Sequence, residues 1–321
     1  MTMRWLPTVD EAFRHRVLGQ DDEACRAWLD SISGVCDDVA RRWELEQAGP
    51  PSFGGTGIVL PVTVRGTRPA ALKLLSPIAD VHAEHRALSA LHGHGTVEVH
   101  DADLERSALL LEFMDGPTLA EVSKRMRSLE AVSIAGRVAG RIAEVPAPRD
   151  APQLAEGAGP WLEQLEEQHE AAHRLGIAVD GRTFAAAVGA VERLGRTRSG
   201  TLTHGDLSFE NIMRPGDGTW IAIDPLFVAG PVEHEAHTVL RSLLPKIVGA
   251  PDPGAAMTEV VRAFCTAADA DPALALDISY ARFVASFYWE SQHQGDPENI
   301  ERLREATRYA GTLHRRHPPS D

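Results

Sequence analysis

The pattern of apolar and polar positions changes along the chain and divides it into segments. Residues 8–43 carry apolar side chains at helical spacing, as in "ACRAWLDSISGVCDDVARRW", and predict a helical segment. The stretch "WELEQAGPPSFGGTGIVLPVTVRGTRPAALKLL" then alternates short β-rich runs with Gly/Pro turns. This alternation predicts antiparallel strands near residues 43–48, 57–65 and 69–75.

The following segment predicts one helix and a second pair of strands. "ADVHAEHRALSALHGHG" has helical periodicity and is expected to end at Gly93 or Gly95. "VEVHDAD" and "SALLLEFM" predict strands around residues 97–102 and 107–113. After "DGPT" the pattern is helical, except for residues 201–224, which predict two short strands and a turn.

These segments predict an α+β protein with two lobes. Residues 1–114 are expected to form a β-rich N-terminal lobe with one main helix and an N-terminal helical extension, and residues 115–321 a helical lobe. A chain of 321 residues is long enough for each lobe to bury its own core.

Composition places the chain among globular cytoplasmic proteins. It is 43% hydrophobic and 24% charged, and no window approaches 18 consecutive apolar residues, so no membrane partner is expected. The N-terminal stretch has no apolar core of signal-peptide length. The cysteines Cys25, Cys36 and Cys265 are far apart and odd in number, which predicts a reduced compartment and buried packing roles.

The net charge of −14 excludes one class of partner and leaves two interpretations open. A nucleic-acid-binding protein normally carries a basic stripe, and the sequence has none. An acidic surface can draw a cationic small molecule to a site, or it can serve only to keep the protein in solution. Charge alone does not decide between them.

The stretch "LTHGDLSFENIMRPGDGTWIAIDP" brings three oxygen-bearing side chains together: Asp206, Asn211 and Asp224. Phosphoryl transfer needs a carboxylate that orients the acceptor hydroxyl and takes its proton, with Mg²⁺ bridging the phosphates. A kinase catalytic loop has the form D-x-x-x-x-N, and "DLSFEN" has that spacing. The alternative is that these residues cap turns, but the whole string, with its hairpin and second Asp, is more specific than the spacing alone.

"HGDLSFENIM" and "WIAIDP" resemble the aminoglycoside phosphotransferase family, which has the bilobal protein-kinase-like fold. "AIDPLFVAGPVEHEA" and "VLPVTVRGTRPAALKL" are most similar to its streptomycin 6-kinase and hydroxyurea phosphotransferase branch. The resemblance runs from about residue 40 to near 240, and more weakly to the C-terminus. It implies that Asp206 is the catalytic base and that Asn211 and Asp224 bind magnesium.

The chain departs from the family pattern at two places. Ser208 and Phe209 stand where His-Pro or a similar pair is common, and Glu235 stands where an Asp is usual. Both departures leave the base and the metal ligands untouched and bear on the acceptor side. His204, two residues before the base, is expected to pack and to bond the loop backbone rather than to act as a base.

A kinase-like N-terminal lobe needs a strand lysine held by a helix carboxylate. Lys73 in "PAALKLL" lies among apolar neighbours and is expected to pair with Glu84, with Asp80 as the alternative partner; the other interpretation is a lysine that reaches the sheet edge. The turn "SFGGTG" is expected to cover the phosphates, and "LLEFMDG" to link the lobes and meet adenine. The nucleotide-binding residues proposed in these two segments are Ser52, Gly55, Thr56, Glu112 and Met114.

The acceptor side is predicted from acidic residues. A cationic acceptor is expected to meet Glu233, Glu235 and Glu290, with the acids of helix 161–175 as a charged outer face or a rim. For Glu235 the family resemblance implies an alternative role, in which it braces the catalytic loop. "HEAH" at 234–237 has its histidines three apart rather than the four that a zinc helix needs. The histidines at 82, 85, 92, 94 and 100 are expected to be solvated.

The sequence therefore predicts a cytoplasmic ATP- and Mg²⁺-dependent O-phosphotransferase, a monomer or weak dimer, acting on an aminoglycoside such as streptomycin. One alternative keeps the chemistry and changes the acceptor to hydroxyurea, a peptide antibiotic or a metabolite alcohol. The other is a nucleotide-binding pseudokinase regulator, which is disfavoured because Lys73, Asp206, Asn211 and Asp224 are all present.

Overall fold

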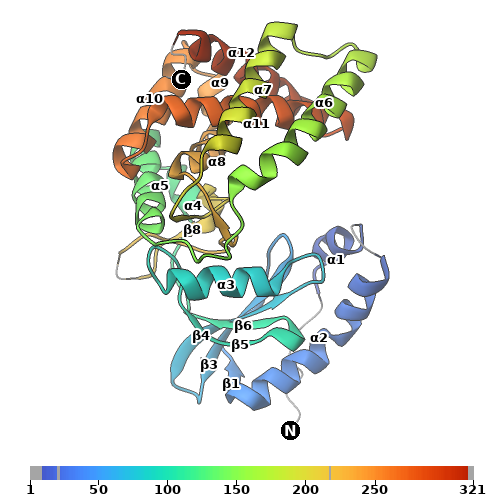
Figure 1. Cartoon of the computed structure of the whole chain (residues 1–321). Coiled ribbons are helices and arrows are strands. Elements are labelled where there is room, and N and C mark those ends of the chain that lie inside the picture. The colour runs from blue at the N-terminus through green and yellow to red at the C-terminus, as the bar shows by residue number, and fades with distance from the viewer. Residues whose placement is uncertain (1–8, 20–21, 217, 317–321) are drawn as a thin grey trace. The chain divides into compact units, whose positions relative to one another are not determined.

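The computed structural model describes residues 9–19, 22–216 and 218–316, and the chain divides into two compact units (Figure 1). The first unit is Met1–Gly116 with Arg214–Thr219, and the second is Pro117–Met213 with Trp220–Asp321. The turn Arg214–Thr219 thus belongs to the first unit, although it lies far along the sequence from the other residues of that unit. A hydrogen bond from Gly216 N to Asp115 Oδ1 (2.9 Å) ties this turn to the end of the first segment.

The first unit contains an antiparallel six-stranded sheet with the order β1-β3-β4-β6-β5 and β2 added beside β3. Its strands are β1 (Leu45–Gln47), β2 (Ser52–Phe53), β3 (Gly57–Val64), β4 (Arg68–Leu75), β5 (Val99–Asp103) and β6 (Ala108–Leu111). In the centre of the sheet, Lys73 on β4 stands opposite Val59 on β3 and Leu109 on β6. The expected strands are present, and the short strand β2 is an addition.

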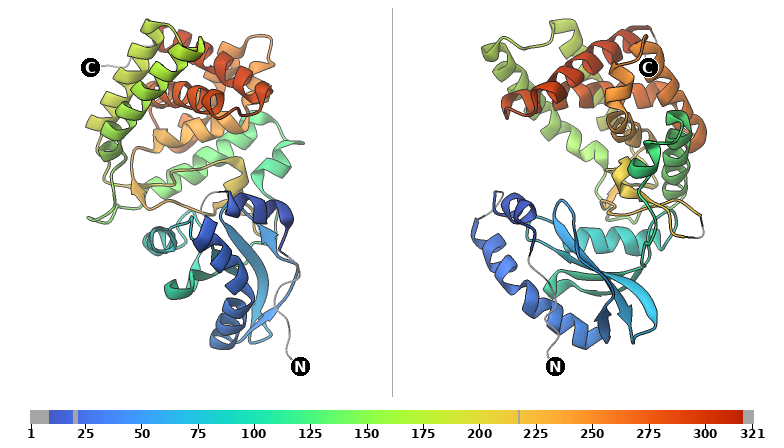
Figure 2. Two further views of the ribbon diagram at one scale, coloured as in Figure 1. Left: turned by 90° about the vertical axis from the view of Figure 1, so that its right-hand side faces the viewer. Right: turned by 180° about the vertical axis from the view of Figure 1, so that it is seen from behind.

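Helices cover both faces of this sheet (Figures 1 and 2). They are α1 (Glu11–Leu18), α2 (Asp22–Trp43), α3 (Val81–Leu91) and the one-turn η1 (Leu104–Arg106). Buried Ile32 and Cys36 of α2 share one apolar cluster with Leu72 and Leu74 of β4. Since successive strand residues point to opposite faces, Lys73 faces away from that cluster, toward α3. The expected helical segment 8–43 is thus two helices, with Gly19 as the C-cap of the first.

The second unit is mainly helical, with short strands around the 201–229 region. Its helices are α4 (Leu119–Ser123), α5 (Ser128–Ala143), η2 (Leu154–Gly157), α6 (Ala158–Leu175), α7 (Gly181–Arg196), η3 (Phe209–Asn211), η4 (Val232–Glu235), α8 (Ala236–Ser242), α9 (Leu244–Val248), α10 (Pro253–Ala268), α11 (Pro272–Gln292) and α12 (Pro297–Arg316). Its strands pair as β7 (Leu202–Thr203) with β10 (Val228–Ala229) and β8 (Ile212–Met213) with β9 (Ile221–Ala222).

Close packing between helices forms the core of the second unit. A side chain at Gly136 of α5 would place its Cβ 2.6 Å from the carbonyl oxygen of Phe264 on α10, so only glycine allows this approach. Helix α11 carries fully buried Tyr280, Phe283 and Tyr288, as expected of its aromatic stripe. Trp289 is the exception, because it is 49% exposed.

Two further expectations can be compared with the described part of the chain. No helix there is long and apolar enough to cross a membrane. Cys25, Cys36 and Cys265 are buried, in agreement with packing roles, and burial raises the pKa of Cys36 and of Cys265 to about 12.

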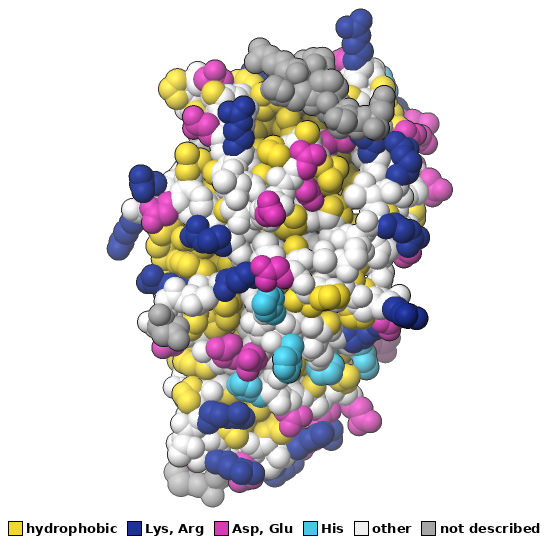
Figure 3. Space-filling model, turned by 60° about the vertical axis from the view of Figure 1, so that its left-hand side comes forward, with side chains coloured by type: hydrophobic (Ala, Val, Ile, Leu, Met, Phe, Trp, Pro, Cys, Tyr) yellow, Lys and Arg dark blue, Asp and Glu magenta, His cyan; other side chains and the backbone are white. Residues whose placement is uncertain are grey.

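Figure 3 shows one face of the molecule, on which histidines lie among intermixed acidic and basic side chains. His82, His92, His94 and His100 are exposed, and His85 is half-buried, so these histidines are largely solvated. No basic stripe is visible on this face.

Candidate functional site

The loop between β7 and η3 presents one carboxylate to solvent. Asp206 is exposed, whereas His204, Gly205 and Leu207 around it are buried. Gly205 adopts φ +86°, a left-handed conformation that favours glycine, and an added Cβ would lie 2.8 Å from the side chain of Leu226. The loop therefore turns sharply just before Asp206 and leaves this side chain available for chemistry.

Glu235, at the end of η4, holds this loop from beneath. Its Oε1 accepts hydrogen bonds from Thr203 Oγ1 (2.5 Å) and Gly205 N (2.6 Å), and its Oε2 accepts one from Leu207 N (3.0 Å). The residue is only 1% exposed. One buried carboxylate thus satisfies two backbone donors of an irregular loop, which fixes the residues on either side of Asp206.

The surroundings keep the Glu235 carboxylate charged. Burial raises the pKa of Glu235, but the nearby His234 and His204 and the hydrogen bonds from Thr203 and Gly205 outweigh burial, so the pKa lies below its ordinary value. This placement corrects the expectation that Glu235 meets the acceptor. A carboxylate that is buried and bonded to the loop has no accessible oxygen for an external cation.

His204 links the loop to the strand that precedes Asp224. Its Nδ1 accepts the N–H of Asp206 (3.3 Å), and its Nε2–H donates to the carbonyl oxygen of Ile223 (2.8 Å). The side chain is fully buried. His204 therefore packs and bonds the loop backbone, as expected from the sequence.

The hairpin of β8 and β9 brings Asn211 and Asp224 to the same end of two paired strands. Ile212 pairs with Ala222, and Ile223 N donates to the carbonyl oxygen of Asn211 (2.9 Å). Asn211 Nδ2 donates to the main-chain oxygen of Asp206 (2.9 Å) and lies 3.4 Å from its Oδ2. This bonding directs the amide nitrogen of Asn211 toward Asp206 and leaves its Oδ1 for another partner.

Asp224 is exposed and has φ +59°. A non-glycine residue in the left-handed region is uncommon and often marks a functional site. Asn211 and Asp224 together offer hard oxygen donors, which suit a magnesium-like cation that completes its shell with water and phosphate. The described residues contain no cluster of three His, Cys, Asp or Glu side chains that could hold a metal on its own.

Two buried histidines lie behind the loop, but they do not form a zinc site. His234 Nε2 accepts from Arg282 Nη1 (3.1 Å), which also donates to the His234 carbonyl oxygen (3.2 Å). The ring of His237 packs edge-on against Phe283 (4.6 Å). Burial, followed by the positive charge of Arg282, lowers the pKa of His234 to about 4.

This pKa predicts how stability depends on pH. Because the unfolded histidine titrates near 6.5, the unfolded state binds a proton between pH 6.5 and 4 that the folded state does not. Stability is therefore full above pH 6.5 and decreases as the pH falls toward 4, by up to roughly 3 kcal/mol from His234. Urea unfolding at several pH values should show a flatter profile for His234→Gln. The same change at the exposed His82 is the control and should leave the profile unchanged. Equal profiles for all three proteins would contradict the prediction.

In the first unit, Lys73 and Glu84 form the expected ion pair. Lys73 Nζ lies 2.7 Å from Glu84 Oε1, and the two side chains are 6% and 11% exposed. Asp80, the alternative partner, instead caps α3 by accepting from Ala83 N (3.0 Å). Lys73 therefore does not reach the sheet edge, and its charge lies on the α3 face of the sheet.

The turn before β3 is open to solvent. Ser52, Gly55 and Thr56 are all exposed, and Ser76 N donates to the Thr56 carbonyl oxygen (2.8 Å). Ser52 Oγ makes only a long bond to the Val59 carbonyl oxygen (3.4 Å). The side chains of Ser52 and Thr56 are thus accessible to a ligand, whereas the Gly54 carbonyl oxygen accepts from Arg16 Nη2 (3.1 Å).

The segment after β6 is less open than expected. Glu112 N donates to the Glu98 carbonyl oxygen (2.9 Å), and the Glu112 carboxylate accepts from Glu98 N (3.3 Å). The N–H of Glu112 is therefore engaged within the unit, which corrects part of its expected role toward adenine. Met114 is half-buried.

The three acids expected at the acceptor do not gather in one pocket. Glu233 Oε1 accepts from the backbone N–H of Asp271, the N-cap of α11 (2.8 Å). Glu290 is half-buried near the other end of α11 and lies against Gly295. At 1.5 Å per residue, Asp271 and Glu290 are about 28 Å apart along the helix. With Glu235 buried, a common carboxylate pocket is excluded.

One residue near the loop was not predicted from the sequence. Burial lowers the pKa of Arg282, against the raising effect of the carboxylates of Glu235 and Asp206, so its guanidinium lies within electrostatic range of both. The available signal was a lone cation in the apolar stretch "SYARFVASFYW". No acidic residue lies within one helical turn of Arg282 in the sequence, so the sequence alone did not predict that its side chain lies near the Asp206 loop.

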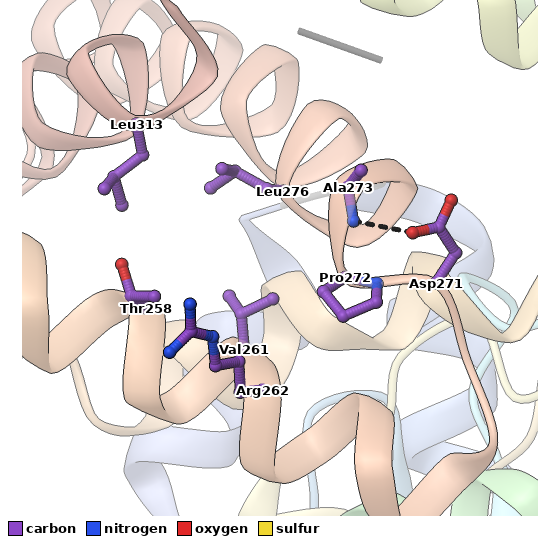
Figure 4. Close-up of a pocket in the computed structure, with 8 residues that line it drawn as sticks. All are labelled: Thr258, Val261, Arg262, Asp271, Pro272, Ala273, Leu276 and Leu313. Atoms are coloured by element: carbon purple, nitrogen blue, oxygen red, sulfur yellow. Dashed lines mark hydrogen bonds between the residues drawn. The ribbon is translucent and has the colours of Figure 1, made fainter. Parts of the chain in front are cut away.

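A well-defined cavity lies elsewhere in the second unit (Figure 4). It has a volume of about 270 Å³ and lies among α10, α11 and α12, with a mostly apolar lining that includes Val261, Leu276 and Leu313. It shares no residue with the loop around Asp206, so it is not the candidate site.

Solved structures of small-molecule kinases resemble the whole chain. Choline kinase LicA from Streptococcus pneumoniae superposes with a TM-score of 0.56 at 14% identity, covering 88% of this chain and 99% of that one. An aminoglycoside phosphotransferase from Alicyclobacillus acidocaldarius gives a TM-score of 0.53 at 13% identity, covering 96% and 95%. These matches confirm the predicted kinase-like fold.

Sequence relatives are more specific. A streptomycin 6-kinase from Streptomyces glaucescens is 28% identical over 280 residues, 86% of this chain and 87% of that protein. A hydroxyurea phosphotransferase from Kitasatospora aureofaciens is 34% identical over 208 residues, 64% of this chain and 60% of that protein. The family model described as aminoglycoside/hydroxyurea antibiotic resistance kinase matches residues 42–294. The chain therefore belongs to this family and is a small-molecule phosphotransferase that acts on a hydroxyl acceptor.

Proposed function

We propose that this protein transfers the γ-phosphoryl group of ATP to a hydroxyl of an aminoglycoside of the streptomycin type, with Mg²⁺ as the metal. The observation that carries the proposal is the exposed Asp206 carboxylate on a loop fixed by Glu235 and His204, beside the oxygen donors of Asn211 and Asp224. The family implies ATP use. The near full-length match to a streptomycin 6-kinase favours this acceptor over others.

Asp206 is the proposed base. Its carboxylate orients the acceptor hydroxyl and takes its proton while the hydroxyl oxygen forms a bond to the γ-phosphorus of ATP. The bond between that phosphorus and the β–γ bridging oxygen breaks at the same time, and ADP is the leaving group. Asn211 Oδ1 and the Asp224 carboxylate would hold Mg²⁺, which neutralises charge on the phosphates. The His204 bonds to Asp206 N and to the residue before Asp224 keep base and metal ligands in a fixed relation.

The first unit is proposed to bind the nucleotide. Lys73 presents a buried ammonium whose position is fixed by Glu84, and such a lysine contacts the phosphates of ATP in kinases. Ser52, Gly55 and Thr56 lie on the exposed turn expected to cover the phosphates, and Met114 follows the last strand of the sheet.

Replacing Lys73 with alanine should lower kcat/KM for ATP by about 10- to 100-fold, because a charge-assisted contact to phosphate is lost. Initial rates over a range of ATP concentrations measure this effect. Lys124→Ala, a change at an exposed lysine, should behave as the wild type. Because the change also removes the ion-pair partner of Glu84, it can lower stability. Thermal unfolding therefore shows whether the loss of activity comes from the lost contact to ATP or from a destabilised fold. A KM for ATP and a kcat within twofold of the wild-type values would show that Lys73 does not contact the nucleotide.

A second acceptor has specific support. Hydroxyurea phosphotransferase is 34% identical to the chain, and hydroxyurea also presents a hydroxyl to the base. The deciding experiment measures ADP release with streptomycin, hydroxyurea, a peptide antibiotic and a simple amino alcohol, with EDTA as the blank. Mass spectrometry should show one phosphoryl group added to streptomycin. Turnover of hydroxyurea alone would shift the assignment to the second acceptor, and nucleotide binding without any turnover would favour a regulatory role.

A further inference from the structure

The C-terminal half of α11 carries a stripe of residues that are half-buried at its start (Arg282 and Ser286) and exposed at its end (Trp289 and His293). Arg282, Ser286, Trp289 and His293 are spaced by four, three and four residues, so they lie on one side of the helix. The opposite side carries buried residues, namely Phe283, Val284, Phe287 and Tyr288. The stripe is therefore bonded to η4 and α8 at its Arg282 end and is open to solvent at its Trp289 end.

The near end of the stripe lies at the catalytic loop. Arg282 Nη1 donates to the carbonyl oxygen of His234 (3.2 Å), the residue before Glu235, whose carboxylate bonds the loop at Gly205. Ser286 Oγ accepts from Arg241 Nη1 (3.4 Å). Ser242, the residue after Arg241, accepts from Phe209 N of the loop (3.1 Å). The stripe thus begins at elements that hold the catalytic loop and runs along α11 to Trp289.

The far end of the stripe carries an exposed and ordered aromatic side chain. Trp289 is 49% exposed, and the His293 ring stacks on it with 4.4 Å between centroids and 21° between planes. His293 Nδ1 also hydrogen-bonds the Trp289 carbonyl oxygen (2.8 Å), which fixes the ring. Exposed tryptophan is costly in solvent, and such residues are enriched where a partner stacks.

Trp289 is seven residues beyond Arg282, or about 10 Å along the helix axis. A hydroxyurea-sized molecule held at the Arg282 end of the stripe cannot span that length, whereas an acceptor with two or three rings can. We propose that Trp289, braced by His293, is the platform on which a distal ring of an aminoglycoside acceptor stacks while its hydroxyl meets Asp206. This inference rests on the proposed function. Cation–π attraction to a guanidinium or ammonium group adds to the stacking.

The test compares acceptor binding with turnover. Trp289→Ala should raise the calorimetric Kd for streptomycin, measured with ADP and Mg²⁺ present, by about tenfold. The KM for streptomycin should rise in parallel, while kcat changes much less and the KM for ATP stays constant. Trp289→Phe should lose only a part of the affinity, because it keeps an aromatic face. Leu129→Ala, at another exposed apolar residue on α5 (40% exposed), is the matched control and should bind as the wild type.

Three outcomes would overturn the inference, and each is distinguishable from the others. If the wild type phosphorylates streptomycin and Trp289→Ala binds it as tightly as the wild type does, the platform is wrong and the proposed function stands. If the wild type neither binds nor phosphorylates any aminoglycoside, the acceptor assignment and the platform are both wrong. A parallel rise in the KM for ATP would indicate a structural effect and would also overturn the platform.

Discussion

Replacing Asp206 with alanine should lower turnover by about 10²- to 10⁴-fold, the usual contribution of a positioned base, while ATP affinity stays nearly intact. The exposed carboxylate is removed, but the main-chain oxygen of Asp206 still accepts from Asn211 Nδ2 (2.9 Å), so the metal ligand keeps its orientation. Steady-state kinetics and nucleotide titration measure the two quantities separately.

The matched control is Glu210→Ala, which removes an exposed carboxylate from the same loop. It should retain activity close to that of the wild type. An Asp206→Ala variant with more than about a tenth of wild-type turnover would show that another group takes the proton.

Replacing Glu235 with alanine is expected to damage both stability and turnover. The change leaves Thr203 Oγ1, Gly205 N and Leu207 N buried without their acceptor. The expected loss is about 3–5 kcal/mol in the free energy of unfolding. Urea unfolding measures this loss, and kcat should fall because the residues flanking Asp206 are no longer held.

Glu233 in the same short helix η4 provides the comparison. Its carboxylate accepts one backbone hydrogen bond, from Asp271 N (2.8 Å), and it is half-buried. Glu233→Ala should cost about 1 kcal/mol. Similar unfolding midpoints and similar kcat values for both variants would mean that Glu235 does not support the loop.

Local patterns predicted the parts of the fold that depend on local rules. The strands β3 and β4 follow from alternation and turn residues, and the partner of Lys73 follows from the cost of burying a lone charge. The helix break at Gly19 and the two-residue strand β2 have weak local signals. Their positions depend on packing that a single segment does not encode.

The acceptor-binding residues were harder to predict, because an acidic side chain can hold the fold together instead of binding a ligand. Glu233, Glu235 and Glu290 were all predicted to meet the acceptor, with a bracing role as the alternative for Glu235. In the structure Glu233 bonds a helix N-cap residue, Glu235 is buried under the loop, and Glu290 lies near the far end of α11. Burial decides which carboxylate can meet a ligand. Arg282 shows the same limit, since its neighbours Asp206 and Glu235 are distant in sequence.

The buried anchor of the catalytic loop also bears on how the enzyme loses activity on heating. In many enzymes the active-site loop melts before the rest of the protein, because such loops are drawn from the least stable parts of the fold. Here the backbone around Asp206 is bonded to Glu235, which is itself packed inside the helical unit. Heating should therefore not melt the loop around Asp206 ahead of the helical unit, so the loop and that unit are expected to lose their structure together.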